Sequence, residues 1–403
     1  MAARRAAFPD HFAWGTTSSS VQLEGVAPAA DWSAWERDGR APRSDEGSGF
    51  RIDWRDDLRL QAEMGCNAVR LTIEWARIEP EPNRVDSTQL DWYADVISHA
   101  RDLGLAPWLT LHSTSLPGWF SEDERGFRDT EALEYYWVRQ VDRCAERFTS
   151  LAAGWVPIDD PIGWAMRGHY LTNRPPAVRD GQMLREAIEG ALEADHRAAQ
   201  LLAAGGEKTM AVRGVPTIFG HGPGADIWVN WWASMLFDTW IDVLDTGELQ
   251  VPDRRVRVRE SWVDDFDYIG LSFDNPIAVD DEGALHPAQQ NERRADNGFV
   301  PLPEELGVLL YRIAERLPER SLVVSSNGVS TSDDTWREQL LTETIDILAN
   351  AVSDGIDLVG YFHDTAVDGY EWRAGHKTQR GLIGRDRNLK GSGEWFSNWL
   401  HDR

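Results

Sequence analysis

The stretch WVPIDDPIGW at residues 155–164 joins an apolar run to two adjacent carboxylates and a proline. Proline cannot donate a hydrogen bond to a strand ladder, and it holds the residue before it in an extended conformation. The run is therefore typical of a buried strand that ends abruptly at Asp159 and Asp160. Two carboxylates so close together resist joint ionisation, so the strand end is also a candidate site.

Seven further apolar runs of similar length lie along the chain, and amphipathic helical patterns such as 53–65, 91–104 and 342–355 separate them. Eight strands that alternate with helices predict an α/β fold, a single (β/α)8 (TIM) barrel over residues 1–403. The segments 160–208 and 274–300 are expected to be insertions at the C-terminal face of that barrel. The eight apolar runs are 12–15, 68–73, 106–111, 154–158, 210–215, 267–273, 321–326 and 358–362.

The composition excludes several classes of partner and site. The chain has 67 acidic and 41 basic residues and a net charge of −26, so neither nucleic acid nor an anionic membrane is expected as a partner. Cys66 and Cys144 are too few for a disulfide framework or a cysteine-only metal site, and both are expected as buried thiols. The N-terminus lacks an apolar segment of signal-peptide length, and no run reaches membrane-spanning length. A cytoplasmic location is therefore expected.

The residues that follow the expected strands are the candidates for function, because the chemistry of (β/α)8 barrels lies at the C-terminal ends of the strands. Carboxylates are frequent among them, whereas only two are histidines. Strand alternation turns those two, His112 and His363, away from the pocket, which disfavours a histidine-rich zinc site. The candidate segments are 74–75, 112–117, 159–161, 274–276, 325–328, 363–364 and 368–372.

Four long motifs, in the same order, resemble those of glycoside hydrolase family 1, the β-glucosidase family of retaining enzymes. The resemblance covers about residues 8 to 400. It implies the barrel fold and a small, sugar-like ligand at the C-terminal face. The motifs are FAWGTTSSSVQLEG (12–25), NAVRLTIEWARIEPEP (67–82), LTLHSTSLPGWF (109–120) and GYFHDTAVDGYEWRAGHKTQRGLIGRD (360–386).

The chain departs from this family at both catalytic positions. The acid/base glutamate of the family's Asn-Glu-Pro motif is replaced by Asp160, and the nucleophile of its Thr-Glu-Asn-Gly motif is replaced by Ser326. A serine without a base cannot form the glycosyl-enzyme ester of a retaining mechanism. The resemblance thus implies a divergent member that lacks both catalytic glutamates.

The resemblance also assigns ligand-binding positions, some kept and some changed. Gln22, Glu371 and Trp372 match family residues that bind sugar hydroxyls, and Arg70 matches the arginine beside the nucleophile. Arg70 is expected to lack its usual partner unless Asp160, Asp364 or Glu74 replaces it. The changed positions are Glu74 for a serine, Ser113 for a histidine, Thr114 for a tryptophan, Asp274 for a tyrosine and Asp364 for a tryptophan.

Three functions stay open at this point. The first is a glycosidase-like enzyme in which Asp160 is the general acid/base, assisted by Asp159 and Asp364. The space left at Ser326 would then hold the water that an inverting hydrolysis requires. The second is a non-catalytic protein that binds a sugar through Gln22 and the other kept residues.

The third is a metal-dependent enzyme. Four carboxylates are expected to face only one cation, Arg70, and an oxygen-rich cluster of this kind suits a divalent metal. The leading hypothesis, the altered enzyme, needs no metal and no cofactor. The sequence leaves the substrate and the oligomeric state undetermined. The four carboxylates are Asp159, Asp160, Asp364 and Glu371.

Overall fold

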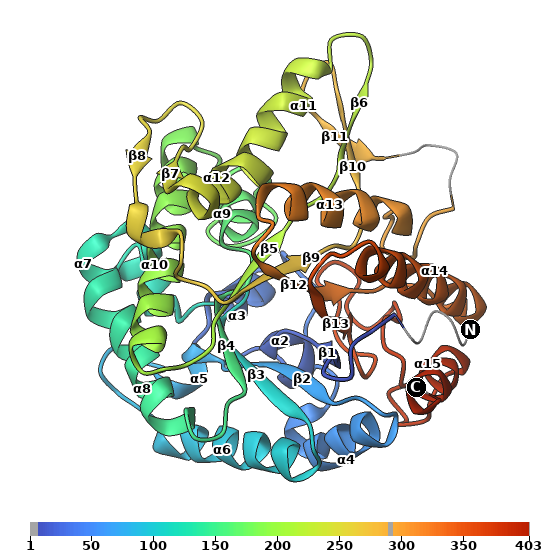
Figure 1. Cartoon of the computed structure of the whole chain (residues 1–403). Coiled ribbons are helices and arrows are strands. Elements are labelled where there is room, and N and C mark those ends of the chain that lie inside the picture. The colour runs from blue at the N-terminus through green and yellow to red at the C-terminus, as the bar shows by residue number, and fades with distance from the viewer. Residues whose placement is uncertain (1–6, 289–292, 403) are drawn as a thin grey trace.

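The computed structural model describes residues 7–288 and 293–402 (Figure 1). Eight strands, parallel to their neighbours, form a sheet in the order β4-β3-β2-β1-β13-β12-β9-β5. Each strand overlaps one of the eight predicted apolar runs, so the predicted strands are confirmed. The strands are β1 (Ala13–Thr17), β2 (Ala68–Thr72), β3 (Ala106–His112), β4 (Gly154–Ile158), β5 (Met210–Gly214), β9 (Tyr268–Ser272), β12 (Ser321–Asn327) and β13 (Leu358–Asp364).

The first and last strands of this order, β4 and β5, meet and close the barrel. The Trp155 N–H donates to the Lys208 carbonyl at 2.9 Å, and the Asp160 N–H donates to the Val212 carbonyl at 3.1 Å. Asp159 forms a parallel bridge with Val212. The two adjacent carboxylates therefore lie on the seam of the barrel, at the C-terminal end of β4.

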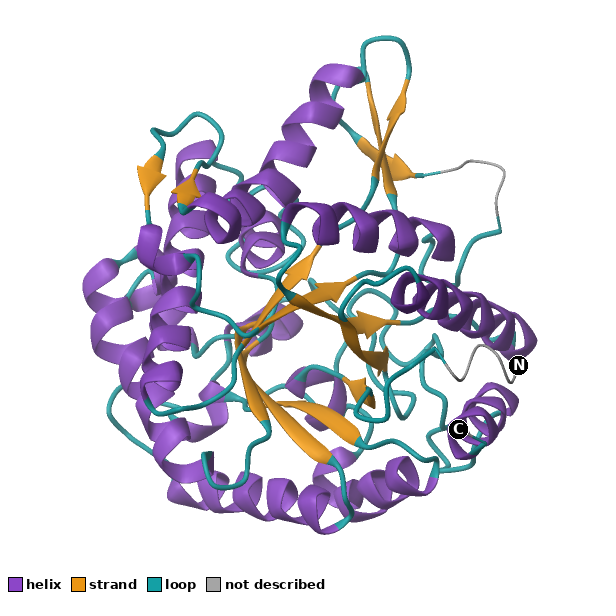
Figure 2. Cartoon of the chain, in the orientation of Figure 1, coloured by secondary structure: helices purple, strands orange, loops and turns teal. Residues whose placement is uncertain are grey.

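A ring of helices surrounds the strands (Figure 2). Residues 160–208, expected as an insertion, instead hold α9 and the 24-residue helix α10, which is part of this ring because its buried stripe packs against β4. The larger helices are α4 (Phe50–Glu63), α6 (Ser87–Asp102), α8 (Val138–Phe148), α9 (Pro161–His169), α10 (Gly181–Ala204), α12 (Thr239–Thr246), α13 (Pro303–Arg316), α14 (Asp334–Ser353) and α15 (Gly391–His401).

A small three-stranded sheet projects from the barrel beside α11 (Figure 1). Its strands come from both sides of β9, and part of it fills the expected insertion 274–300, of which residues 289–292 lie outside the described ranges. The elements of this projection and the shorter elements are β6 (Ile218–His221), β10 (Ile277–Asp280), β11 (Leu285–Pro287), α11 (Asp226–Ala233), α2 (Ser20–Glu24), α3 (Asp31–Arg37), α5 (Trp75–Ile78), α7 (Thr130–Ala132), β7 (Glu248–Leu249) and β8 (Arg257–Val258).

An aromatic cluster joins the two ends of the chain beneath the barrel strands. Trp14 of β1 is paired in register with Tyr361 of β13, and its ring lies 4.6 Å from that of Trp399 on α15. Phe12 also packs against Trp14, with its ring centroid 4.5 Å from that of Trp14. All four side chains are buried. This part of the core therefore depends on residues more than 340 positions apart.

Two further expectations concern cysteines and membranes. Cys66 and Cys144 are buried and form no disulfide within the described ranges, which confirms their prediction as buried thiols. None of the helices in the described ranges combines the length and the apolar character that crossing a membrane requires.

Candidate functional site

Arg70 on β2 reaches across the interior of the barrel to Asp159. Its Nη1 lies 2.8 Å from Oδ2 of Asp159 and also donates to Thr110, while Nη2 donates to the Ser325 carbonyl at 3.2 Å. The side chain of Arg70 is only 3% exposed. Arg70 was expected to lack a partner unless Asp160, Asp364 or Glu74 supplied one, and the partner that it has is instead Asp159.

Asp160 points instead toward the backbone around it. Its φ of 56° lies in the left-handed region, and it caps the N-terminus of α9. Oδ1 accepts hydrogen bonds from the N–H groups of Gly163 at 3.0 Å and Gly214 at 3.1 Å, and Oδ2 lies 3.0 Å from Arg167. A Cβ atom would stand 1.8 Å from Oδ2 at position 163 and 2.5 Å from it at position 214. The two glycines thus form a close-fitting cradle for this carboxylate.

Burial raises the pKa of Asp160, while the positive charge of Arg167 and the two backbone N–H groups oppose that rise. The carboxylate of Glu74 is also held by hydrogen bonds to nearby residues. It caps α5 through the Ala76 N–H at 3.2 Å and accepts hydrogen bonds from Ser20 and Ser115. Neither carboxylate is therefore a free group in the pocket.

Arg380 neutralises two further carboxylates, a role that the sequence analysis did not predict. Its Nε lies 3.0 Å from Oδ2 of Asp364, and its Nη2 forms an ion pair with Asp274. The side chain of Arg380 is 5% exposed. Burial raises the pKa of Asp364, and Asp274 raises it further, while Arg380 and Arg70 lower it. The expectation that Arg70 alone faces the acidic cluster is therefore wrong, because Arg167 and Arg380 also pair with its members.

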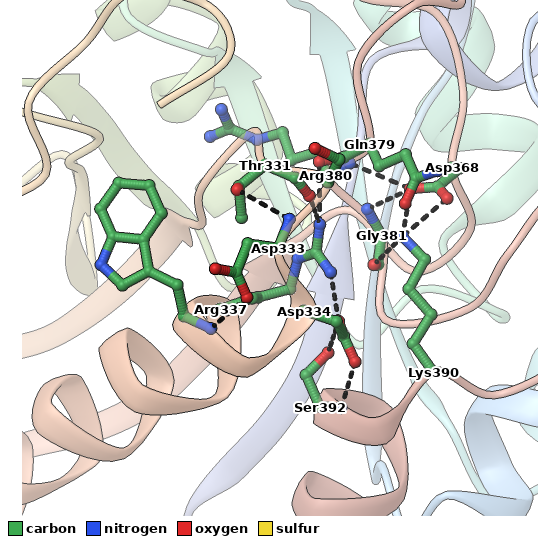
Figure 3. Close-up of polar contacts among 12 residues, drawn as sticks. Thr331, Asp333, Asp334, Arg337, Asp368, Gln379, Arg380, Gly381, Lys390 and Ser392 are labelled. Carbon is green, nitrogen blue, oxygen red and sulfur yellow. Dashed lines mark hydrogen bonds and ion pairs between the residues drawn. The ribbon is translucent and has the colours of Figure 1, made fainter. Parts of the chain in front are cut away.

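The backbone on both sides of Arg380 is fixed by a second set of polar contacts (Figure 3). Asp368 accepts the Arg380 N–H at 2.9 Å, and Lys390 pairs with Asp368 at 2.6 Å. Arg337, buried on α14, donates to the Gln379 carbonyl at 3.0 Å. Arg380 therefore enters the site from a rigid backbone, with its guanidinium direction set in advance.

Glu371 differs from the other carboxylates of the group, since it forms no ion pair with any residue in the described ranges. Its Oε1 accepts a hydrogen bond from the Gln22 amide at 3.4 Å, and Gln22 in turn accepts one from the Ser19 hydroxyl at 2.7 Å. Burial raises the pKa of Glu371 to about 7, although Arg380 and the Gln22 hydrogen bond lower it. Gln22 and Glu371, both predicted to bind ligand, are thus brought together.

Trp372, which follows Glu371 in the chain, lies next to Trp32 of α3. The two indoles meet edge to face at 4.9 Å. The guanidinium of Arg174, from the loop between α9 and α10, lies 3.8 Å from the Trp372 ring centroid. One face of Trp372 is therefore covered by a cation of the protein itself.

The two predicted serines make few contacts. Ser326 is 8% exposed, and Ser113 lies 3.4 Å from Thr114, hydroxyl to hydroxyl. Among the described residues, neither hydroxyl hydrogen-bonds to the charged groups above. His363, the nearest histidine by sequence, is buried beside Tyr361, with its Nδ1 3.3 Å from the phenol oxygen. Burial lowers the pKa of His363 to about 3.

The third hypothesis, a metal-dependent enzyme, requires a group of side chains that can bind a metal ion. Over residues 7–288 and 293–402, no three or more His, Cys, Asp or Glu side chains are grouped so that they could hold a metal ion. The carboxylates at the strand ends are matched by arginines instead. Asp159 pairs with Arg70, Asp160 with Arg167, and Asp364 and Asp274 with Arg380.

Sequence reasoning missed Arg167, Arg174 and Arg380. Arg167 carries a local signal, because it stands seven residues after Asp160 and therefore on the same face of α9. Arg380 lies inside a recognised motif, but its partner Asp274 is 106 positions away. No local pattern connects such a pair.

Comparisons with known proteins agree with this architecture. The chain is 24% identical to β-glucosidase A of Thermotoga maritima, over 97% of each chain. A solved β-glycosidase from Pyrococcus horikoshii superposes with a TM-score of 0.88 at 25% identity, over 98% of this chain and 94% of that one. A T. maritima β-glucosidase in complex with deoxynojirimycin gives 0.89 at 22% identity, over 98% of each. The model of the family described as glycosyl hydrolase family 1 matches residues 4–213 and 271–402, and the chain therefore belongs to that family.

Proposed function

We propose that this protein binds a sugar-like small molecule at the C-terminal end of its barrel and does not hydrolyse glycosides by a retaining mechanism. The observation that carries the proposal is the cradle around Asp160. A general acid must present its proton to the leaving group. Here the carboxylate is occupied by two backbone N–H groups and by Arg167.

The nucleophile position supports the same conclusion. A serine becomes nucleophilic when a base within hydrogen-bond reach takes its proton. Among the described residues, no such base hydrogen-bonds to Ser326. The Nδ1 of His363 lies 3.3 Å from the Tyr361 hydroxyl instead.

An inverting hydrolysis is the alternative, and it requires a free carboxylate as well as a water. Asp160, Asp159 and Asp364 were predicted to supply that chemistry. Each of them is paired with an arginine. Protonating Asp159 or Asp160 would leave Arg70 or Arg167 without its counter-ion, and protonating Asp364 would remove one of the two counter-ions of Arg380, which is costly.

The ligand-binding part of the family site is better preserved. Glu371, held by Gln22 and free of ion pairs with the described residues, is suited to accept hydrogen bonds from sugar hydroxyls. Trp372 adds an indole N–H and an apolar edge. Arg70 and Asp274, also predicted to bind substrate, are proposed to shape the pocket through their ion pairs, and Ser113 is proposed to leave room for the ligand. The T. maritima β-glucosidase, similar in fold, was solved with the sugar-like inhibitor deoxynojirimycin.

Two measurements on the purified protein test the proposal. Isothermal titration with deoxynojirimycin is expected to show binding that Gln22→Ala weakens at least tenfold. The matched control Gln182→Ala, an exposed glutamine on α10, is expected to leave that binding unchanged. Incubation with 4-nitrophenyl α- and β-glycosides is expected to release no nitrophenol above the buffer blank.

Either half of the proposal has a result that overturns it. Nitrophenol release that Asp160→Asn abolishes would assign an acid/base role to Asp160. The anomer formed first, followed by proton NMR, would then separate inversion from retention. Absence of binding to deoxynojirimycin and to a panel of neutral and anionic sugars, in a folded sample, would reject the ligand site.

A further inference from the structure

Arg174 occupies an unusual position beside the proposed ligand site. Its guanidinium lies against two indoles that are perpendicular to each other, with its central carbon 3.8 Å from the ring centroid of Trp372 and 4.8 Å from that of Trp32. The residue comes from the loop between α9 and α10. Trp372 follows Glu371 directly, so the cation lies next to the carboxyl that is proposed to bind ligand hydroxyls.

This guanidinium lacks a counter-ion. No carboxylate in the described ranges lies within 4 Å of it, and its Nη1 is buried without a hydrogen-bond partner. The nearby arginines of the site differ, because Arg70, Arg167 and Arg380 each have an aspartate partner. Arg174 is half-buried, and in a chain with 67 acidic residues it lacks the carboxylate partner that these three arginines have.

The surroundings of Arg174 increase its need for an anion. Burial and the positive charges of Arg167 and Arg373 lower the pKa of Arg174, while Glu371 raises it only weakly, as the last of the causes. Removing a charge from water without pairing it is costly. A ligand that brings a negative charge to this position would remove that cost.

We propose that Arg174 binds an anionic substituent, a carboxylate or a phosphate, of the sugar-like ligand. This inference rests on the proposed function, since it concerns the same pocket. The planar guanidinium matches both groups with paired N–H donors, and its cation–π contacts with Trp372 and Trp32 restrain its position. The protein as a whole is strongly negative and repels anions, so capture of one requires a local cation of this kind.

The experiment compares one sugar scaffold with and without charge. Isothermal titrations use methyl β-D-glucopyranoside as the neutral probe, methyl β-D-glucuronide as the carboxylate and glucose 6-phosphate as the phosphate. The wild-type protein is expected to bind one of the two anionic probes at least tenfold more tightly than the neutral one. The tighter of the two identifies the source of the charge.

Variants then assign the preference to a residue. Arg174→Gln is expected to reduce the preference for the anionic probe to less than about twofold. Arg179→Gln is the matched control, because Arg179 is an exposed arginine of the same loop that stacks on Tyr170 at 5.1 Å, and it should keep the full preference. If circular dichroism shows that Arg174→Gln is unfolded, Arg174→Lys replaces it, with at least a threefold loss of preference expected.

Each remaining outcome overturns a defined statement. Neutral and anionic probes that bind equally well would reject the role of Arg174 and leave the proposed function intact. A preference for the anion that survives Arg174→Gln would also reject it. A folded protein that binds none of the three probes, nor deoxynojirimycin, would reject the proposed function itself, and the inference with it.

Discussion

Replacing Asp160 should destabilise the fold, because this side chain joins the N-terminus of α9 to the end of β5. Asp160→Ala removes the cap of α9, which is worth about 1 kcal/mol. It also leaves the partly buried Gly214 N–H without its acceptor, at about 1–3 kcal/mol. The contribution of Arg167 is smaller, because its side chain is 32% exposed. The expected loss in free energy of unfolding is therefore about 3 kcal/mol.

Two further variants sharpen this prediction. Asp160→Asn keeps an acceptor and tolerates the left-handed backbone, so a loss of about 1 kcal/mol is expected. Gly163→Ala should destabilise, because the new Cβ would stand 1.8 Å from Oδ2 of Asp160. In the Asp160→Ala background the same change should stabilise by up to about 1 kcal/mol, as alanine ordinarily does in a helix.

Urea unfolding followed by tryptophan fluorescence measures all four proteins against the wild type. The change of sign at position 163 is the decisive result, since general damage to α9 would not produce it. If Asp160→Ala lost less than 1 kcal/mol and Gly163→Ala behaved alike in both backgrounds, the cradle would not hold the carboxylate. The argument that Asp160 is structural would then be refuted.

Three other predictions follow from buried groups. Burial raises the pKa of Asp31 from 3.8 to about 7. The folded state therefore keeps a proton that the unfolded state loses near pH 4, and the free energy of unfolding falls as the pH rises toward 7. Asp31→Asn should remove up to about 3 kcal/mol of that fall, measured by urea unfolding at pH 4.5 and 8; an unchanged difference would contradict it. Arg380→Met leaves Asp364 and Asp274 unpaired and should lower the free energy of unfolding by about 3–5 kcal/mol, measured by calorimetry. Adding Asp364→Asn and Asp274→Asn to this variant should restore part of the loss. If nothing were restored, the pairing would be rejected. Trp399→Ala should cost about 3–5 kcal/mol by urea unfolding, and a loss below 1 kcal/mol would contradict its core role.

The barrel was readable from the sequence because its strands are buried on both sides. Such strands appear as continuous apolar runs, and eight of them separated by helical patterns have few alternative architectures. The projecting sheet was missed because β6 and β11 are short and partly exposed, with no such run. Helix α10 was taken for an insertion because the segment 160–208 is long enough to hold an extra helix, α9, before it.

The site was readable only in part. Family motifs located Gln22 and Glu371, and the structure brings these two together. The direction of Asp160 could not be predicted, since it depends on a left-handed backbone and on two glycines, one of them 54 positions away. Ion pairs between distant segments, such as Arg380 with Asp274, depend on the closed barrel and leave no periodic signal.

The pairing of β1 with β13 has a consequence for biosynthesis. One hydrogen-bonding edge of β1, together with Phe12 and Trp14, has its partners only in the last part of the chain. At about 5–20 residues per second, a ribosome needs roughly 20 to 70 s to proceed from β1 to β13. During that interval the nascent chain carries an open strand edge beside large aromatic side chains, which is a typical target for chaperones. The barrel can therefore close between β1 and β13 only near the end of translation.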